Sequence, residues 1–226
     1  MNVLKNKIIK SIIAIVSAAL LLIAAIFYIP KFFTAKKQTS TAQFSRPDAR
    51  RDEIAGKVIT LKRYQPEYAK AFMKMCTPVV RKPLYLDFPW TLENVKKQLQ
   101  KEARIEKKGD TLWYLIFDNA DEQLVGSVQI REYAPYRKSM PGQFTCWLNE
   151  KYWGGGRIRE AIKLIAHEYF RLHKDAKHFD GHVEMDNLRS YYALKKAGFK
   201  LFKTWEDPEG FQKPRYILIY PNPAFA

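Results

Sequence analysis

Three consecutive glycines, Gly154, Gly155 and Gly156, lie where a strand-like stretch gives way to a helical pattern. The first backbone N–H groups of a helix have no acceptor within it, and with the helix dipole they form a site for anions. Because glycine has no side chain, a phosphate could approach the backbone directly. Arg157 and Arg159 add positive charge beside the helix start. The segment therefore predicts a phosphate or pyrophosphate site.

Two well-known phosphate-binding loops do not fit this segment. A Walker A loop needs Lys-Ser or Lys-Thr after its last glycine, whereas Arg157 and Ile158 follow here. The dinucleotide fingerprint needs a small residue at Arg159, and it normally follows the first strand of a βαβ unit. A tight turn in which the glycines serve geometry alone remains an alternative.

Metal chemistry is not indicated by the cysteines or histidines. Cys76 and Cys146 are far apart and match no metal-ligand spacing, so we expect two reduced, mostly buried thiols. Four histidines match no zinc signature and are interpreted as surface or helix-end residues: His167, His173, His178 and His182. No metal cofactor is expected.

The elements that must position the glycines follow from hydrophobic periodicity, caps and turn residues. The pattern predicts strands at 57–64, 111–117, 124–132, 142–149, 178–185, 200–205 and 215–220, and helices at 66–76, 91–108, 156–173 and 187–199. Thr91 is the expected N-cap of the second helix, and Gly198 is expected to end the fourth. We expect an α/β fold of the α+β type, with a mixed sheet and helices on its faces.

The stretch "CWLNEKYWGGGRIREAI", followed later by "NLRSYYALKKAGF", resembles the GNAT superfamily of acyl-CoA N-acyltransferases. In that family a strand leads into a Q/R-x-x-G-x-G/A loop and a long helix, and the loop backbone binds the pyrophosphate of coenzyme A. Lys151, Gly154 and Gly156 take the motif positions. Lys151 departs from the usual Gln or Arg, and Arg157-Ile158 is bulkier than usual.

These motifs, together with "FPWTLENVKKQL", are similar to the branch that contains the ribosomal-protein N-terminal acetyltransferases. The resemblance covers about residues 57 to 220. It implies a GNAT-like fold and acetyl-CoA as co-substrate. The strand around Trp147 would pair with the pantetheine amides, the glycine loop would hold the pyrophosphate, and Ser190 would lie near the thioester. The implied cofactor-binding residues are Trp147, Leu148, Asn149, Lys151, Gly154, Gly155, Gly156, Arg157, Ile158, Asn187 and Ser190.

The resemblance also implies direct attack of an amine on the thioester in a ternary complex. The leaving thiolate then needs a proton. Many family members supply it from a tyrosine at the position of Leu194, while Tyr191 and Tyr192 are out of register on the helix. Ser190 is therefore the expected donor, with a helix cap or a packing contact as the alternative role.

Candidates for the remaining catalytic roles are acidic or aromatic. Glu184 and Glu132 lie at strand ends and are candidates for the general base. A base is not required if the acceptor amine has a low pKa, as an α-amino group does. Trp90, Trp113 and Tyr133 could line the acceptor pocket, or they could be packing residues.

An uncharged run at residues 11–29 precedes the domain. At a rise of ~1.5 Å per residue it is long enough to span the ~30 Å hydrocarbon core of a bilayer. We predict a transmembrane anchor within residues 1–30, with a cleaved signal peptide as the alternative. Residues 31–56 are predicted to be a linker, and residues 57–222 the GNAT-like domain.

The distribution of charge predicts the orientation of this anchor. More Lys and Arg residues follow the uncharged run than precede it, so the positive-inside bias favours a single-pass membrane protein with a cytoplasmic C-terminal domain. The net charge of +16 points to an anionic partner, such as a phosphate-rich co-substrate or anionic lipid. Nucleic acid is not an expected partner, because no helix-turn-helix or aromatic-basic motif is present.

The leading interpretation is a membrane-anchored, acyl-CoA-dependent N-acyltransferase. It is expected to transfer an acetyl group from acetyl-CoA to a primary amine, such as a protein N-terminus or a small amine. The alternative is a catalytically weak GNAT-like interaction module held at the membrane. The absence of tyrosine at Leu194 and the bulk of Ile158 motivate that alternative.

Overall fold

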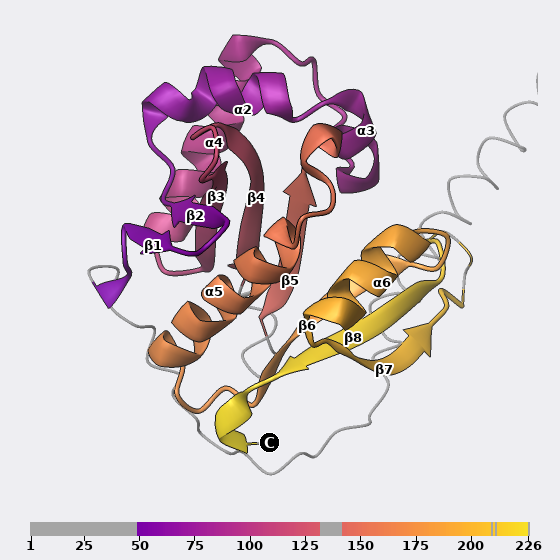
Figure 1. The fold of residues 1–226 in the computed structure, drawn as a ribbon. Coiled ribbons are helices and arrows are strands. Elements are labelled where there is room, and N and C mark those ends of the chain that lie inside the picture. Colours follow the sequence, from indigo (N-terminus) through magenta and orange to yellow (C-terminus); the bar gives the residue numbers. More distant parts are fainter. Residues whose placement is uncertain (1–48, 132–141, 209, 211, 226) are drawn as a thin grey trace, which may run out of the picture. The chain divides into compact units, whose positions relative to one another are not determined.

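A mixed sheet organises the chain in the computed structural model, which describes residues 49–131, 142–208, 210 and 212–225 (Figure 1). The described part contains an eight-stranded sheet in the order β1-β2-β3-β4-β5-β6-β8-β7. The strands are β1 (Glu53–Ala55), β2 (Ile59–Lys62), β3 (Thr111–Asp118), β4 (Leu124–Arg131), β5 (Gln143–Leu148), β6 (His178–Glu184), β7 (Lys200–Trp205) and β8 (Arg215–Pro221). Only β5 and β6 pair in parallel, so the predicted mixed sheet is confirmed.

The helices connect the strands and include every helix predicted above. The α-helices are α2 (Ala69–Met75), α3 (Pro78–Arg81), α4 (Leu92–Lys107), α5 (Arg157–Leu172) and α6 (Leu188–Ala197), and the 3₁₀ turns are η2 (Pro66–Tyr68), η3 (Lys82–Leu84), η4 (Glu150–Tyr152) and η5 (Pro223–Phe225). Thr91 caps α4 by accepting the N–H of Asn94 at 3.3 Å. Gly198 ends α6 with φ of 116°, as expected.

Strand β1 corrects the predicted linker boundary at residue 56. Residues 53–55 pair antiparallel with β2, so ordered structure begins inside the predicted linker. The strand has three residues, and only Ile54 among them is buried, which is too short a pattern to show alternation. Helix α3 was also not predicted, because its four residues are fewer than two helical turns.

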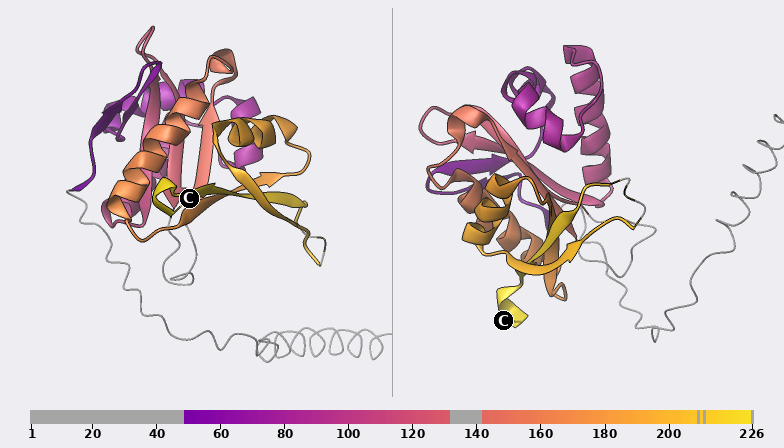
Figure 2. Two further views of the ribbon diagram at one scale, coloured as in Figure 1. Left: turned by 60° about the horizontal axis from the view of Figure 1, so that its bottom comes forward. Right: turned by 90° about the vertical axis from the view of Figure 1, so that its right-hand side faces the viewer.

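The two faces of the sheet carry separate cores. Helix α5 packs on one face, and α2 and α4 pack on the other (Figure 2). Strand β3 shows the division, because its alternate residues enter different clusters. Tyr114 and Ile116 join the α5-side core, whereas Trp113 and Leu115 join the α2/α4-side core.

The parallel contact between β5 and β6 is short. Only two residue pairs are in register, Gln143 with Asp180 and Phe144 with Gly181. Beyond Phe144 the two strands separate, and β6 instead pairs along its length with β8. This separation leaves one edge of β5 without a neighbouring strand over its carboxyl half, and it creates the cleft described below.

A buried arginine fastens the segment before β1 to the end of α4. The Arg50 guanidinium donates to the backbone carbonyls of Glu106 (2.7 Å), Thr111 (2.7 Å) and Gly109 (2.9 Å). It also donates to the Glu106 carboxylate at 3.1 Å. Arg63 binds the other oxygen of that carboxylate at 2.8 Å. Because these groups are buried, each depends on the others for its hydrogen bonds.

We expect Arg50→Met to lower the free energy of unfolding by about 3 kcal/mol, because it leaves a buried carboxylate half-paired and removes a charged donor from three carbonyls. Urea denaturation of the full chain measures this change. Lys97→Met is the matched control, because the Lys97–Glu93 pair is exposed and should contribute at most ~0.5 kcal/mol. A loss below about 1 kcal/mol for Arg50→Met would contradict this account of the buried cluster.

Glu160 ties the first turn of α5 to β2. Its carboxylate accepts the backbone N–H groups of Lys57 (2.7 Å), Val58 (2.8 Å) and Ile59 (3.0 Å). Burial acts to raise the pKa of Glu160, but these three donors outweigh it and hold the pKa below its ordinary value. The helix that follows the glycines is therefore positioned by a charged side chain.

Because the pKa of Glu160 is lowered in the folded state, its contribution to the free energy of unfolding depends on pH. The stabilisation is complete above the unfolded-state pKa and is lost as the pH falls through the lower folded-state pKa. Glu160→Gln should therefore be less stable than wild type at pH 7, with a difference that shrinks on acidification. Urea denaturation at several pH values from about 7 to 3 tests this. A difference that stays constant or grows towards low pH would contradict the charged-acceptor role.

No helix in the described ranges is long and apolar enough to cross a membrane. The predicted anchor at residues 11–29 lies outside the described residues, as does most of the predicted linker. The membrane anchor therefore stays a prediction.

Candidate active site

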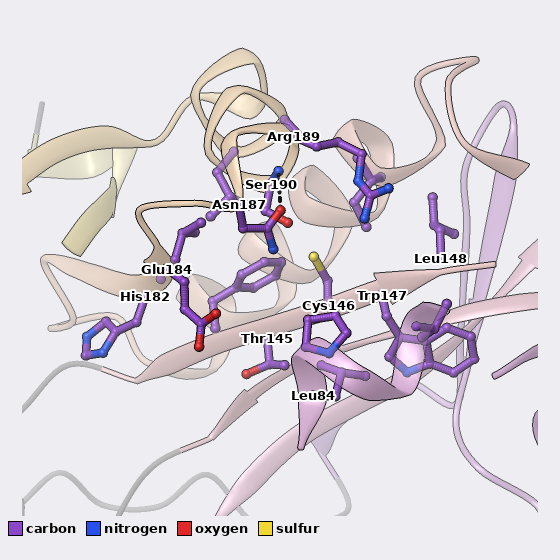
Figure 3. A pocket seen from close by; sticks show the side chains of 18 of the residues that line it. Leu84, Thr145, Cys146, Trp147, Leu148, His182, Glu184, Asn187, Arg189 and Ser190 are labelled. Carbon is purple, nitrogen blue, oxygen red and sulfur yellow. Dashed lines mark hydrogen bonds between the residues drawn. The ribbon is translucent and has the colours of Figure 1, made fainter. Parts of the chain in front are cut away.

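A cleft with a volume of about 480 Å³ opens where β5 and β6 separate (Figure 3). One wall comes from β5, and the other from the end of β6 and the start of α6. The segment 79–85 closes one side, and Trp153 and Gly154 lie at the edge of the glycine loop. Of the residues predicted for the site, those lining the cleft are Trp147, Leu148, Gly154, Ile158, Glu184, Asn187 and Ser190.

The free edge of β5 offers main-chain groups to a ligand in this cleft. On its other edge β5 pairs with β4 from Gln143 to Leu148. Trp153 Nε1 donates to the carbonyl of Leu148 at 2.9 Å, which holds the next turn close to the strand end. An extended ligand with its own amides could pair with the remaining backbone groups as an added strand does.

The three glycines all adopt the left-handed region. Their φ angles are 89° at Gly154, 59° at Gly155 and 79° at Gly156, where other residues are strained. A Cβ on Gly154 would meet no atom within 4 Å, so the space beside it is open. Gly156 is the residue before α5, whose first N–H groups have no acceptor within the helix. The loop therefore has the geometry of an anion site.

Three side chains predicted to bind the cofactor do not line the cleft. Arg157 forms an ion pair with the buried Asp118 and lies over the ring of Tyr152 at 5.6 Å, and its guanidinium is directly beside Gly155 in the loop. Asn149 is buried and donates to the carbonyl of Met75 at 2.8 Å. Lys151 is exposed on η4. The positive charge of Arg157 therefore lies at the loop, where Asp118, a partner that only the fold brings close, balances it.

Arg189 places a cation at the loop end of the cleft instead. Its guanidinium carbon lies 3.5 Å from the centre of the Trp153 ring, and both residues line the cleft. This stacking orients an otherwise exposed side chain. The sequence reasoning did not single out Arg189, although its place directly before Ser190 in the motif was a usable signal.

Asn187 and Ser190 have separate tasks. Asn187 is the N-cap of α6, and its side-chain oxygen accepts the N–H of Ser190 at 3.2 Å (Figure 3). The Ser190 hydroxyl has no hydrogen-bond partner among the described residues and belongs to the cleft lining. The helix cap is therefore supplied by Asn187, and the hydroxyl of Ser190 is available to a ligand.

The tyrosines near Ser190 do not replace it. Leu194 is buried and lines the cleft. Tyr191 packs against Tyr216, with ring centres 4.4 Å apart, and Tyr192 is exposed. Neither tyrosine lines the cleft, as their register on the helix predicted.

Glu184, at the end of β6, is hydrogen-bonded to the segment 79–85 that closes one side of the cleft. It accepts a short hydrogen bond from the hydroxyl of Tyr85, which comes from the turn after η3. Lys213 binds the other carboxylate oxygen at 3.2 Å. The hydrogen bond to Glu184 raises the pKa of Tyr85, so this phenol stays protonated at neutral pH. Tyr85 has φ of 52°, an uncommon conformation for a residue with a side chain, and no local sequence signal identified it.

Two further groups in the cleft can exchange protons or react with acyl groups. His182 lines the cleft from β6, with Nε2 3.2 Å from the Asp180 carboxylate, so it is a partly exposed strand residue rather than a helix-end residue. Cys146 also lines the cleft, and burial raises the pKa of its thiol to about 12. A thiol of this pKa is a poor nucleophile at neutral pH, which favours direct transfer over an acyl-cysteine intermediate.

Two of the acceptor-pocket candidates lie beside a second cavity. Trp90 and Trp113 line a space of about 270 Å³ on the α2/α4 side of the sheet. Glu132 and Tyr133 lie outside the described residues. Within the described ranges, no three His, Cys, Asp or Glu side chains are grouped to hold a metal ion.

Comparisons with known proteins agree with this geometry. The profile of the family described as an acetyltransferase (GNAT) domain matches residues 59–200. The ribosomal-protein-serine acetyltransferase of Escherichia coli (strain K12) is 24% identical over 109 residues, which span 48% of this chain and 58% of that protein.

Solved structures share the fold at low identity. The ribosomal-protein alpha-N-acetyltransferase RimL superposes with a TM-score of 0.63 at 18% identity, covering 75% of this chain and 94% of RimL. The microcin self-immunity acetyltransferase MccE, solved with acetyl-CoA and AMP, gives 0.60 at 18% identity and covers 74% and 94%. At this identity the likeness shows a common fold.

Proposed function

This chain belongs to the GNAT acetyltransferase family, and on that premise we propose that it transfers an acetyl group from acetyl-CoA to a primary amine. The observation that carries the proposal is the separation of β5 from β6 directly before a loop of three left-handed glycines. Together they supply a free strand edge that lines the cleft and an anion site where the cleft meets Gly154. Acetyl-CoA has amides in its pantetheine arm and a pyrophosphate beyond it, in the same order.

The residues present fit this co-substrate. The edge of β5 from Thr145 onward would pair with the pantetheine amides, and the N–H groups of the glycine loop and the start of α5 would bind the pyrophosphate. Arg189 would add a positive charge at the loop end of the cleft, whereas the charge of Arg157 beside Gly155 is already paired with Asp118. The thioester would then lie towards Ser190, between the strand and the start of α6.

The reaction proceeds by direct attack in the ternary complex. The amine nitrogen forms a bond to the thioester carbonyl carbon, the C–S bond breaks, and the electron pair leaves with sulfur. Ser190 donates a hydrogen bond to the developing thiolate, and the proton lost by the amine balances the proton gained by the free thiol of CoA. No covalent enzyme intermediate is required.

Glu184 is the proposed acceptor of the amine proton. It lies at the end of β6 in the cleft, and its carboxylate already contacts an ammonium group, that of Lys213. An acceptor ammonium could bind in the same way and lose its proton there. His182, two residues earlier on the same side of β6, is a second group that could take this role.

We propose that the acceptor is a protein N-terminus or a small amine. The family branch and the named relatives support an α-amino group, since the Escherichia coli relative is a ribosomal-protein-serine acetyltransferase.

We also propose that residues 11–29 anchor the domain at a membrane, with the domain in the cytoplasm, where acetyl-CoA is available. Deleting residues 1–35 should move the chain from the membrane pellet to the supernatant, and an unchanged pellet fraction would count against the anchor.

Titration calorimetry of the full chain in mild detergent tests the acetyl-CoA site. We expect one molecule of acetyl-CoA to bind per chain. Free thiol should then appear when an acceptor amine is added. If no heat is detected up to millimolar acetyl-CoA, the proposed function fails.

A further inference from the structure

A second cavity adjoins the cleft on the α2/α4 side of the sheet. Its volume is about 270 Å³, and it shares Leu84, Thr145 and Trp147 with the cleft. Thr145 and Trp147 are two residues apart on β5 and so face the same side of the sheet. A molecule in this cavity could therefore reach the thioester end of the cleft along β5.

Five aromatic residues line this cavity, and neighbouring groups hold several of them in place. Trp113 Nε1 donates to the Ser127 hydroxyl at 2.8 Å, and Trp90 Nε1 donates to the carbonyl of Met73 at 3.2 Å. Phe72 meets the edge of Trp147, with ring centres 5.1 Å apart, and Phe88 lies 5.2 Å from Trp90. The walls are thus rigid and already shaped before any ligand binds.

The charges at the cavity cancel each other. Glu102 pairs with Arg131 and also accepts from Gln98 Nε2 at 3.0 Å. These are the charged residues among the described lining, one of each sign. The cavity therefore has no unpaired charge to offer a charged group, and burying one there would be unfavourable.

One neutral polar group faces the cavity without a partner. Gln129 is half-buried in the middle of the sheet, in register with Trp113 on β3 and with Thr145 on β5. Its side-chain amide has no hydrogen-bond partner among the described residues. An amide between two aromatic walls can fix one polar atom of an otherwise apolar ligand.

We propose that this aromatic cavity selects acceptors whose amine is attached to a bulky, uncharged, planar group. The inference rests on the proposed acetyl transfer and names the class of its acceptor. A cavity of ~150 Å³ with apolar walls accepts benzene, so about 270 Å³ has room for a one- or two-ring group. The ring enters between Trp90, Trp113 and Trp147, a polar atom on it bonds Gln129, and the amine points along β5 towards the thioester.

Small polar amines and polyamines do not use this site well. The side chain of an acceptor such as a serine N-terminus would leave most of the cavity unfilled. A polyamine would bring a second positive charge into a space whose only carboxylate, among the described lining residues, is already paired with Arg131. Burial of an aromatic ring should instead favour its acceptor by about 10- to 100-fold in kcat/KM.

The test compares primary alkylamines with and without an aromatic ring on the full chain with saturating acetyl-CoA. Tyramine, tryptamine, ethanolamine and putrescine are assayed by release of CoA thiol. We expect kcat/KM at least about tenfold higher for the two aromatic amines. Trp90→Leu should reduce the ratio of aromatic to small-amine kcat/KM, whereas Trp205→Leu, on the edge strand β7 and outside both cavities, should preserve it.

Acetyl-CoA calorimetry on the same preparation separates the possible failures. If acetyl-CoA binds but ethanolamine or putrescine is preferred, or no aromatic amine is acetylated, the aromatic-acceptor inference is overturned and the acetyl-CoA site stands. If acetyl-CoA does not bind, the proposed function fails, and the inference falls with it. An unchanged ratio in Trp90→Leu would also overturn the inference.

Discussion

Replacing Gly156 by glutamate should abolish the stabilisation that acetyl-CoA gives the folded chain. Gly156 has φ of 79°, where a residue with a Cβ is strained by roughly 1–2 kcal/mol. The new carboxylate would also lie at the start of α5, where the pyrophosphate is proposed to bind, and would repel it. We expect the affinity for acetyl-CoA to fall by on the order of 100-fold or more.

A thermal-shift titration measures this effect. A ligand present at ~100 times its Kd stabilises the native state by about 2.7 kcal/mol, which is a shift of several degrees in Tm. Wild type should show this shift, and Gly156→Glu should not. Gly210→Glu is the matched control, since Gly210 has a similar φ of 72° and a position in the β7–β8 connection, and at neither glycine would a Cβ come closer than 3.4 Å to another atom.

The control separates strain from binding. Both variants should lose some intrinsic stability, because each forces a side chain into the left-handed region. Only Gly156→Glu should lose the response to acetyl-CoA. If Gly156→Glu keeps the full response, the glycines are turn geometry alone, and the pyrophosphate must be placed elsewhere.

Ser190→Ala should lower kcat for acetyl transfer by about 100-fold or more, because the leaving thiolate would lose its proposed proton donor. The fold should be unaffected. The cap of α6 is the side chain of Asn187, and the Ser190 hydroxyl has no partner among the described residues. Steady-state kinetics and thermal unfolding on the same preparation test both statements.

Two further variants distinguish a lost proton donor from a lost helix cap and test the alternative donor. Asn187→Ala should lose about 1 kcal/mol of stability, because it removes the N-cap. Tyr85→Phe removes a different cleft hydroxyl, which donates to the Glu184 carboxylate. If Ser190→Ala keeps wild-type kcat and Tyr85→Phe does not, the proton comes from the opposite wall of the cleft, and the assignment of Ser190 is wrong.

Much of the fold could be predicted because it depends on short-range patterns. Alternation along β2 and the helical spacing in α4 and α5 are local, as are the cap at Thr91 and the helix end at Gly198. Elements shorter than one clear period, such as β1 and α3, could not be recognised in this way. Strand β1 is recognised only through its pairing with β2, and α3 only through the burial of Val80 in a core whose other members come mainly from α2, α4 and the sheet.

The sequence by itself determined the backbone of the candidate site. Three adjacent glycines allow positive φ angles without steric strain, and all three adopt such angles. The tertiary structure decided which side chains serve the cleft. Arg157 was a reasonable ligand by position, yet Asp118, 39 residues earlier, pairs with it instead. Tyr85 and Glu184 meet across 99 residues, and the aromatic cavity combines three strands with α2, α4 and the segment between them. Backbone angles follow from local sterics, whereas a flexible charged or aromatic side chain turns towards whichever partner the fold brings close to it.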